Sequence, residues 1–324
     1  MNHIVLICDN AYVLPTIVTI QSIKECIENQ KEHFCIHICS PKLDEHHKEK
    51  IESMKMDLMD VCVHLFDFND LKDKIANVQQ KSHVSVAALV KFNLPFLFPN
   101  IDMILYLDSD IVVKNDFLNI FSVDVSDYYL AAVYEFWKYL YDLRYCPSNL
   151  KKKVFYFNSG VMLLNLKKMR IDHISEKLWD YKKNHAKTKL MDQECFNKIC
   201  GSLVLPLTIE WNLNPFFLQQ KFIGYINDVY NVSFQGIEEI LESAKIIHYV
   251  GKSDKPWIYK NARYNEIWMK FYDKVFASEQ LVLKEFESVH LGFFERFIGE
   301  IKEHGFWSFC CFLRYKILSR MHLI

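Results

Sequence analysis

Two carboxylates stand two residues apart at the end of the most strand-like run in the chain. The apolar segment 103–107 leads directly into Asp108, Ser109 and Asp110. A turn after a buried strand can direct both carboxylates at one hard cation, and Mg²⁺ or Mn²⁺ bound in this way usually completes its shell with substrate phosphates. A bare Asp-x-Asp is more often a plain polar turn, but the preceding strand favours a metal site here.

A histidine and a lysine follow another apolar run, at 245–247. His248 offers an imidazole that suits Mn²⁺ as a third ligand, and Lys255 offers a point charge for phosphate oxygens. A single histidine is usually a core or surface residue without a metal. Because Gly251 and Trp257 accompany this lysine, a binding loop is the favoured interpretation.

Two further polar groups adjoin predicted elements. Asn158 and Ser159 precede the apolar run 161–166 and could hydrogen-bond sugar hydroxyls, although an ordinary turn before a strand fits them equally well. Asp192 and Gln193 stand where a helix is predicted to begin, so Asp192 could instead cap that helix. The residue pattern leaves both alternatives open.

Short apolar runs alternate with segments of helical spacing along most of the 324 residues. This alternation predicts an α/β fold with a mostly parallel sheet, helices on both faces, and ligands at the carboxyl ends of the strands. We expect one catalytic domain over 1–260 and a helical C-terminal extension over 261–324. The predicted strands are 3–8, 34–39, 61–66, 103–107, 130–133, 161–166 and 203–207, and the predicted helices are 16–28, 44–56, 84–97 (ended by Pro95 and Pro99) and 174–183.

The composition excludes several classes of protein. A hydrophobic content of 51% with 24% charged residues is typical of a globular chain, and a net charge of -1 gives no overall field that would gather nucleic acid. No two glycines form a Gly-x-Gly, so neither a dinucleotide fingerprint nor a P-loop is present. The ten cysteines lack a Cys-x-x-Cys spacing, and we interpret them as reduced thiols of a cytoplasmic protein.

The N-terminus shows no secretory signal, and no apolar stretch reaches the length of a membrane span. The segment 305–324 contains no acidic residue and mixes Arg314, Lys316 and Arg320 with aromatic and aliphatic side chains. That composition suits a helix on an anionic membrane surface, which would make the protein peripheral to the membrane. A terminal helix packed on the catalytic domain is the alternative.

Taken together, the motifs resemble family 8 of the retaining glycosyltransferases, which includes bacterial lipopolysaccharide galactosyl- and glucosyltransferases and is distantly similar to glycogenin. The resemblance covers roughly residues 3–260, and its pieces occur in the order of the family. They are Asp9 with Tyr12, Lys91, the segment 105–110, the segment 157–160, Asp192 with Gln193, and His248 through Gly251 to Lys255, Pro256 and Trp257.

The resemblance implies a GT-A fold, a UDP-sugar donor and a Mn²⁺ or Mg²⁺ cofactor. The implied metal ligands are Asp108, Asp110 and His248. By the same resemblance, the residues that bind the donor are Asp9 (to the uracil), Tyr12 (stacked on the uracil), Lys91, Asp108, Ser109, Asp110, Asn158, Gly251 and Lys255 (the last two to the phosphates).

The implied catalytic residues are Asp110, Asp192 and Gln193, of which the last two would face the anomeric carbon. Family 8 is thought to proceed by front-face attack assisted by the departing phosphate. The mechanism of glycoside hydrolases, which uses a pair of catalytic carboxylates, therefore does not apply to it. The resemblance therefore implies a hexosyltransferase that acts with retention on a saccharide or glycolipid acceptor, in lipopolysaccharide or other surface glycan assembly.

Two positions depart from the family pattern. Ala11 replaces a frequent Asn after the uracil-binding acid, and Lys91 replaces an Arg that commonly contacts the donor. Arg and Lys are not interchangeable at a forked site, so the donor preference is open. The segments 134–153 and 211–222 are the predicted acceptor wall.

Two other functions compete with this one. Asp108 to Val112 resembles the nucleophile motif of haloacid-dehalogenase-type phosphohydrolases, but that motif usually lies near the start of a chain, and no paired Asp-Asp follows residue 110. A catalytically inactive module that binds a sugar nucleotide is the second alternative. Such a module would have little need for His248 together with both aspartates.

Overall fold

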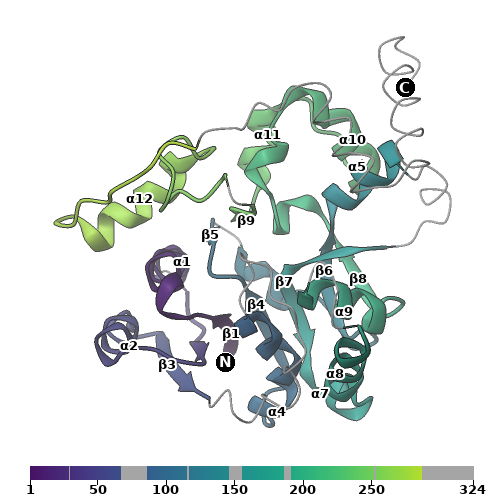
Figure 1. Ribbon diagram of the computed structural model, residues 1–324, viewed down its shortest axis with the longest axis horizontal. Coiled ribbons are helices and arrows are strands. Elements are labelled where there is room, and N and C mark those ends of the chain that lie inside the picture. The colour runs from purple at the N-terminus through teal and green to yellow at the C-terminus, as the bar shows by residue number, and fades with distance from the viewer. Residues whose placement is uncertain are drawn as a thin grey trace.

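The computed structural model describes residues 1–28, 30–66, 86–114, 117–145, 155–185, 191–251 and 253–286. A seven-stranded sheet of order β3-β2-β1-β4-β7-β6-β8 lies between two layers of helices (Figure 1). Its strands are β1 (Asn2–Ile7), β2 (Phe34–Ser40), β3 (Met59–Leu65), β4 (Met103–Leu107), β6 (Leu130–Tyr134), β7 (Phe157–Asn165) and β8 (Val204–Leu207).

Only β7 runs against the other strands of this sheet, because it pairs antiparallel with both β4 and β6 while all other neighbours are parallel. The predicted α/β fold with a mostly parallel sheet is therefore confirmed. Two short strands, β5 (Ile111–Val113) and β9 (Ile246–His248), form a separate antiparallel pair. Three residues are too few to show a period, which is why β5 was absent from the prediction.

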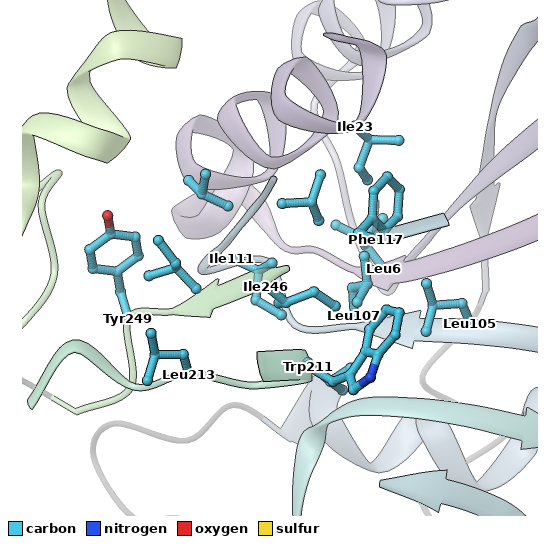
Figure 2. Packing of buried hydrophobic residues seen from close by; sticks show 14 of the residues in the cluster. Leu6, Ile23, Leu105, Leu107, Ile111, Phe117, Trp211, Leu213, Ile246 and Tyr249 are labelled. Carbon is cyan, nitrogen blue, oxygen red and sulfur yellow. The ribbon is translucent and has the colours of Figure 1, made fainter. Parts of the chain in front are cut away.

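Successive side chains of the strands point to opposite faces of the sheet and pack into two hydrophobic cores. Ile4 and Leu6 of β1 pack into the first core, with α1 and α12, whereas Val5 points into the second core. Figure 2 shows Leu6, Leu105 and Leu107 in the first core. The helices of the first layer are α1 (Val13–Ile27), α2 (Glu45–Glu52) and α12 (Asn265–Phe276), and the second layer contains η2 (Val86–Asn93), α4 (Leu94–Leu97), α7 (Leu166–Ile171), α8 (Ile174–Asn184) and α9 (Met191–Cys200).

The remaining helices of the described residues lie in the connections between strands. They are η1 (Asn10–Tyr12), η3 (Phe117–Ser122), α5 (Phe136–Tyr145), η4 (Ile209–Trp211), η5 (Pro215–Phe217), η6 (Gln220–Phe222), α10 (Ile223–Tyr230) and α11 (Ile237–Ser243). None of the helices in the described ranges has the length and apolar composition that a membrane span requires.

Three local predictions need correction. Of the segment predicted as one helix over 84–97, residues 84 and 85 lie outside the described residues, and the rest forms a 3-10 helix, η2, followed by α4, with Pro95 in the first turn of α4 instead of ending a helix. A proline fits there because the first N–H groups of a helix have no intrahelical partner. Asn158 and Ser159 lie within β7 and not in a turn before it.

The described part of the C-terminal extension is not detached from the catalytic domain. Helix α12 packs against α1, and its residues Trp268, Tyr272 and Phe276 join the first core. The aromatic and basic segment 305–324 lies outside the described residues, so its place at a membrane surface stays a prediction.

Candidate active site

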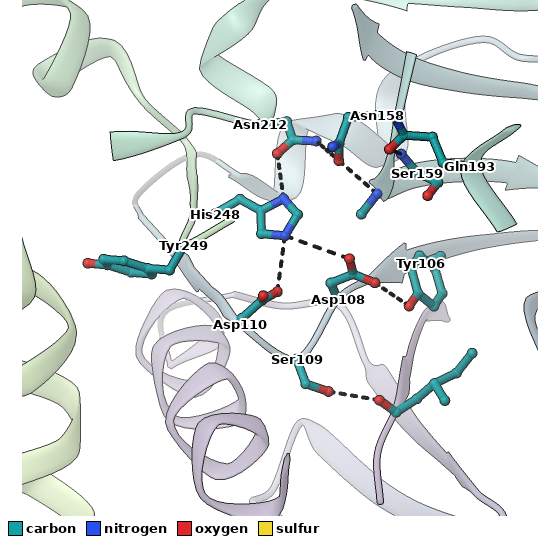
Figure 3. Close-up of polar contacts among 12 residues, drawn as sticks. Tyr106, Asp108, Ser109, Asp110, Asn158, Ser159, Gln193, Asn212, His248 and Tyr249 are labelled. Atoms are coloured by element: carbon teal, nitrogen blue, oxygen red, sulfur yellow. Dashed lines mark hydrogen bonds and ion pairs between the residues drawn. The ribbon is translucent and has the colours of Figure 1, made fainter. Parts of the chain in front are cut away.

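Strand ends bring the predicted motifs together at one edge of the sheet. The backbone N–H of Asp108, directly after β4, donates to the carbonyl of Gly160 near the start of β7 at 2.8 Å. In the smaller sheet, Ile111 of β5 pairs with His248 of β9. These pairings place residues from three distant parts of the sequence side by side (Figure 3).

Asp108, Asp110 and His248 surround one point. His248 Nε2 lies 3.0 Å from Asp110 Oδ1 and 3.6 Å from Asp108 Oδ2, and one donor atom from each residue lies within 4.8 Å of the others (Figure 3). The predicted metal ligands are thus brought together. Gly160 makes this approach possible, because a Cβ at that position would lie 2.2 Å from His248 Cε1 and 2.8 Å from Asp108 Oδ2.

A chain of amides sets the orientation of the His248 ring. His248 Nδ1 lies 2.9 Å from Asn212 Oδ1, and Asn212 Nδ2 donates to Asn158 Oδ1 at 2.9 Å. Asn158 Oδ1 also accepts from the backbone N–H of Gly160, and Asn158 Nδ2 donates to the Glu135 carboxylate at 2.8 Å. Since a backbone N–H only donates and an ionised carboxylate only accepts, the direction of every hydrogen bond in this chain is determined.

The consequence is a fixed tautomer for His248. Asn212 Oδ1 must accept, so Nδ1 carries a proton, and in the neutral ring Nε2 would present its lone pair to the two aspartates. Buried metal-binding histidines are commonly oriented by such a hydrogen bond from the other ring nitrogen. Glu135 and Asn212 lie within the predicted acceptor segments, but sequence reasoning gave them no role in orienting His248, because an isolated Glu and a Trp-Asn pair carry no metal-site pattern.

The arrangement fits a hard divalent cation. When His248 is neutral, its Nε2 and the Asp110 carboxylate oxygen Oδ1 face each other at 3.0 Å as two acceptors, and no other hydrogen-bond donor reaches this buried oxygen. Two facing acceptors in a buried site are unfavourable unless a positive charge lies between them. Two carboxylates and one imidazole are a donor set that suits Mn²⁺ or Mg²⁺.

Two lysines flank these ligands, of which Lys91 is buried and Lys255 is slightly exposed. Lys255 forms an ion pair with Asp110 and donates to the carbonyl of Tyr249 at 2.8 Å. Burial alone would raise the pKa of Asp110, but its contacts with Lys255 and His248 outweigh burial and hold its pKa well below the usual range. Burial likewise opposes the charge of Lys255, yet Asp110 raises the pKa of that lysine. Both groups are therefore ionised at neutral pH.

On the other side, Lys91 links two carboxylates. Its Nζ lies 2.6 Å from Asp192 Oδ2 and 3.2 Å from Asp108 Oδ1. Burial would lower the pKa of Lys91, but these two aspartates outweigh it and the pKa rises. Tyr106 donates to the same Asp108 oxygen at 2.5 Å, and burial together with Asp108 raises the pKa of its hydroxyl well above normal. Asp108 is thus held in place before any ligand arrives.

The two predicted catalytic residues of α9 lie next to this cluster. Asp192 Oδ2 accepts from the hydroxyl of Ser159 at 2.9 Å as well as from Lys91, and Gln193 Oε1 accepts from the Ser159 backbone N–H at 3.2 Å. Gln193 Nε2 lies 3.5 Å from Glu135. The alternative in which Asp192 only caps α9 leaves these contacts unexplained.

The remaining predicted residues lie around the same edge. Tyr12 interacts electrostatically with Lys255 and with both ligand aspartates, and its ring lies 6.1 Å from that of Trp257. Asp9 accepts from the Ala11 N–H as the cap of η1, and Gly251 has a φ of 95°, which favours glycine. The hydroxyl of Ser109 donates to the carbonyl of Ile7 at 3.0 Å, so it ties β4 to β1 and is not directed at the three ligands.

Both predicted acceptor segments contribute to one pocket beside the amide chain. Its lining joins residues of the β6–α5 connection to residues around η4 and η5. They include Glu135, Phe136, Asn158, Asn212, Asn214 and Phe217. The pocket shares Asn158 and Asn212 with the support of His248, so a molecule bound there would lie close to the cation site.

Comparison with known proteins identifies the relatives of this chain. It is 30% identical to the glycosyltransferase GlyE of Streptococcus pneumoniae over 193 residues, which are 58% of this chain and 42% of GlyE. It is 26% identical to a lipopolysaccharide 1,2-glucosyltransferase of Escherichia coli over 258 residues, which are 77% of this chain and 71% of that enzyme. General stress protein A of Bacillus subtilis is 26% identical over 55% of this chain and 61% of its own length. The chain thus spans about two fifths of the length of GlyE and about three fifths of that of General stress protein A.

Solved structures agree on the fold. LgtC, solved as an active-site mutant, superposes with a TM-score of 0.68 at 17% identity and covers 84% of this chain and 95% of its own. The bifunctional glycosyltransferase WbbM superposes with a TM-score of 0.66 at 22% identity and covers 84% of this chain and 49% of its own. The predicted GT-A fold is thereby confirmed. Because the profile of Glycosyl transferase family 8 matches residues 3–261, the chain belongs to that family.

Proposed function

We propose that the protein is a metal-dependent glycosyltransferase that transfers a hexose from a UDP-sugar to a saccharide acceptor. The observation that carries the proposal is the convergence of Asp108, Asp110 and the Nε2 lone pair of His248 on one point. Lysines on either side, Lys91 and Lys255, add positive charge where a diphosphate would lie. A donor set of this kind beside fixed cations suits a nucleotide diphosphate better than a neutral ligand.

Different residues of the chain would bind different parts of the donor. Mn²⁺ or Mg²⁺ held by Asp108, Asp110 and His248 would neutralise the charge that develops on the diphosphate as UDP leaves. Lys255 and the backbone at Gly251 would bind the phosphates, while Asp9 and Tyr12 would bind the uracil. The buried, already ionised groups need little reorganisation during the reaction, which is the condition under which electrostatic stabilisation is effective.

Asp192, Gln193 and Asn158 would orient the donor sugar. The contacts of Asp192 with Lys91 and Ser159 support a role in binding over one in nucleophilic attack, because its Oδ2 already accepts two hydrogen bonds. We propose retention of the anomeric configuration, with the departing phosphate assisting the acceptor hydroxyl. The pocket beside Glu135 would hold the acceptor.

The biological setting follows from the relatives. We propose galactose or glucose as the transferred sugar, and similarity to a lipopolysaccharide 1,2-glucosyltransferase supports glucose, as well as lipopolysaccharide or another surface glycan as the acceptor class. We propose that the protein acts in the cytoplasm, peripheral to the inner face of the membrane. Membership of family 8 leaves the phosphohydrolase alternative without support.

UDP release from a panel of UDP-sugars, with and without Mn²⁺, tests this function. We expect one donor to be turned over by the wild type only with metal, and not by Asp110→Asn. The exposed Asp127→Asn is the matched control and should behave as the wild type. Binding of UDP without turnover of any donor or acceptor would favour the inactive binding module, and inversion in the NMR spectrum of the first product would contradict retention.

A further inference from the structure

A second group of potential metal ligands lies on β1, β2 and β3, outside the candidate active site. The sequence Cys-x-His occurs twice, as Cys35 with His37 on β2 and as Cys62 with His64 on β3. Parallel pairing aligns His37 with Cys62, and His3 of β1 with Cys35. Because side chains two residues apart share a face of a strand, these five residues lie on one face of the sheet.

The distances within this group suit a cation. His3 Nδ1 lies 3.1 Å from His37 Nε2, and Cys35 Sγ lies 3.9 Å from His37 Nδ1. One donor atom from each of these three residues lies within 4.8 Å of the other two. Ligand atoms about 2.0 to 2.3 Å from a tetrahedral ion lie roughly 3.3 to 3.8 Å apart. The 3.1 Å and 3.9 Å distances involve opposite nitrogens of the His37 ring, so only the 4.8 Å limit applies to all three donors, and they would have to approach by up to about 1 Å to share an ion.

The donors of this group are largely shielded from water. Cys35 and His37 are each only 7% exposed, and the ring of Phe98 packs 4.6 Å from that of His37. Of the two ring nitrogens of His37, Nε2 faces His3 at 3.1 Å and Nδ1 faces His64 at 2.9 Å. The ring nitrogen that does not bind an ion can hydrogen-bond to a neighbouring imidazole, as metal-binding histidines usually do.

We propose that His3, Cys35 and His37 form a second metal site, selective for a borderline-soft divalent ion of the Zn²⁺ class. Imidazole and thiolate ligands favour Zn²⁺, whereas Mg²⁺ and Mn²⁺ prefer the oxygens of the aspartate site. Binding converts the Cys35 thiol to a thiolate, and its proton passes to solvent. The site is independent of the proposed glycosyl transfer.

Two further donors adjoin this His3–Cys35–His37 site. Cys62 Sγ lies 3.9 Å from Cys35 Sγ, and His64 Nε2 lies 2.9 Å from His37 Nδ1. Structural zinc sites are almost always four-coordinate, so rotation of one of these side chains would complete the shell. An ion held in this way would join β1 and β2, and with a fourth ligand also β3, at the outer part of the sheet.

Titration of the full-length, reduced protein with Co²⁺ in excess Mg²⁺ tests the site. A thiolate bound to Co²⁺ produces a charge-transfer absorption that oxygen ligands do not produce. We expect one equivalent of Co²⁺ to give this absorption, and Zn²⁺ to abolish it, in the wild type and in Asp110→Asn. Cys35→Ala should lose it completely, whereas Cys39→Ala, which removes another buried thiol of the same strand, should keep it.

His3→Gln covers the case in which Cys35→Ala fails to fold, because His3 is only partly buried. We expect His3→Gln to weaken Co²⁺ binding at least about tenfold while the far-ultraviolet circular dichroism stays unchanged. Absence of the charge-transfer absorption in the wild type, or its persistence in both Cys35→Ala and His3→Gln, would overturn the proposal.

Discussion

The two histidine clusters of this sheet differ in charge and in place. Asp108, Asp110 and His248 lie at strand ends, and two lysines compensate their carboxylates. His3, Cys35 and His37 lie on the face of β1 and β2, and their interactions are hydrogen bonds among uncharged rings and thiols. Ligand chemistry alone therefore assigns a hard cation to the first cluster and a borderline-soft ion to the second.

The positions of the two clusters in the fold indicate different roles. In open α/β sheets, ligands bind beyond the carboxyl ends of the strands, where loops leave room for a substrate. The aspartate cluster occupies that edge and adjoins the pocket lined by Glu135 and Asn212. The His3–Cys35–His37 site is packed against Phe98. The first can meet a substrate, and the second can only connect strands.

Replacing one ligand in each cluster should give the largest contrast. We expect Asp110→Asn to lower donor turnover roughly 1000-fold, because it removes a ligand worth several kcal/mol of charge stabilisation and leaves Lys255 unpaired. Cys35→Ala should change turnover less than about twofold, since the His3–Cys35–His37 site does not touch the edge of the sheet where the substrate would bind. Steady-state UDP release from both variants measures this. Equal losses in the two variants would mean that the clusters are not functionally separate.

Replacing Gly160 tests how closely Asp108 and His248 must approach each other. Gly160→Ala introduces a methyl group 2.2 Å from His248 Cε1 and 2.8 Å from Asp108 Oδ2, so the ligands must separate. We expect turnover to fall about 100-fold, the usual cost of a displacement near 1 Å at a reacting centre. Gly224→Ala is the matched control, because nothing lies within 4 Å of a Cβ there. A fully active Gly160→Ala would contradict the observed packing.

Asn212 tests whether the amide chain supports the metal site. Without its side chain, the His248 Nδ1 proton loses its acceptor and the ring can adopt the other tautomer. We expect Asn212→Ala to raise the Mn²⁺ concentration for half-maximal activity about 10- to 100-fold, as for other residues that orient metal ligands. Zn²⁺ binding at the His3–Cys35–His37 site should stay unchanged. An unaltered Mn²⁺ dependence would show that His248 is oriented by its backbone alone.

Much of the aspartate site was predictable from sequence because its residues follow strands. Asp108 and His248 come directly after or at the end of apolar runs, and the rule that ligands gather at strand ends brings them together. Their support was not predictable. The amide chain joins Glu135, Asn158 and Asn212 through contacts 23 to 54 residues apart in sequence, which no local pattern reveals.

The His3–Cys35–His37 site shows a different limit of prediction from sequence. The repeated Cys-x-His pattern was visible, but it does not match the Cys-x-x-Cys spacing of zinc ribbons. Its meaning depends on the register of β1, β2 and β3, because a shift by one residue would turn every side chain to the other face. Short apolar strands do not determine their own register, so sequence alone could not identify this group.

The smallest effect concerns the pH dependence of stability without metal. The pKa of His37 is lowered from 6.5 to about 3 in the folded state. Between about pH 3 and pH 6.5, His37 therefore binds a proton in the unfolded chain but not in the folded chain. The contribution of His37 to stability is thus complete above pH 6.5 and is lost as pH falls toward 3.

We expect His37→Gln to reduce the loss of unfolding free energy between pH 6.5 and 4, because Gln carries no titrating proton. Urea unfolding in the presence of a chelator, compared between wild type and variant at each pH, measures the difference. Carboxylates elsewhere add the same acid-dependent loss to both proteins, so only the difference between the two slopes reports on His37. His46→Gln, at an exposed histidine, should leave the slope of the wild type unchanged. If His37→Gln behaves like His46→Gln, the ring of His37 is not held neutral, and the contrast between a charged and an uncharged cluster fails.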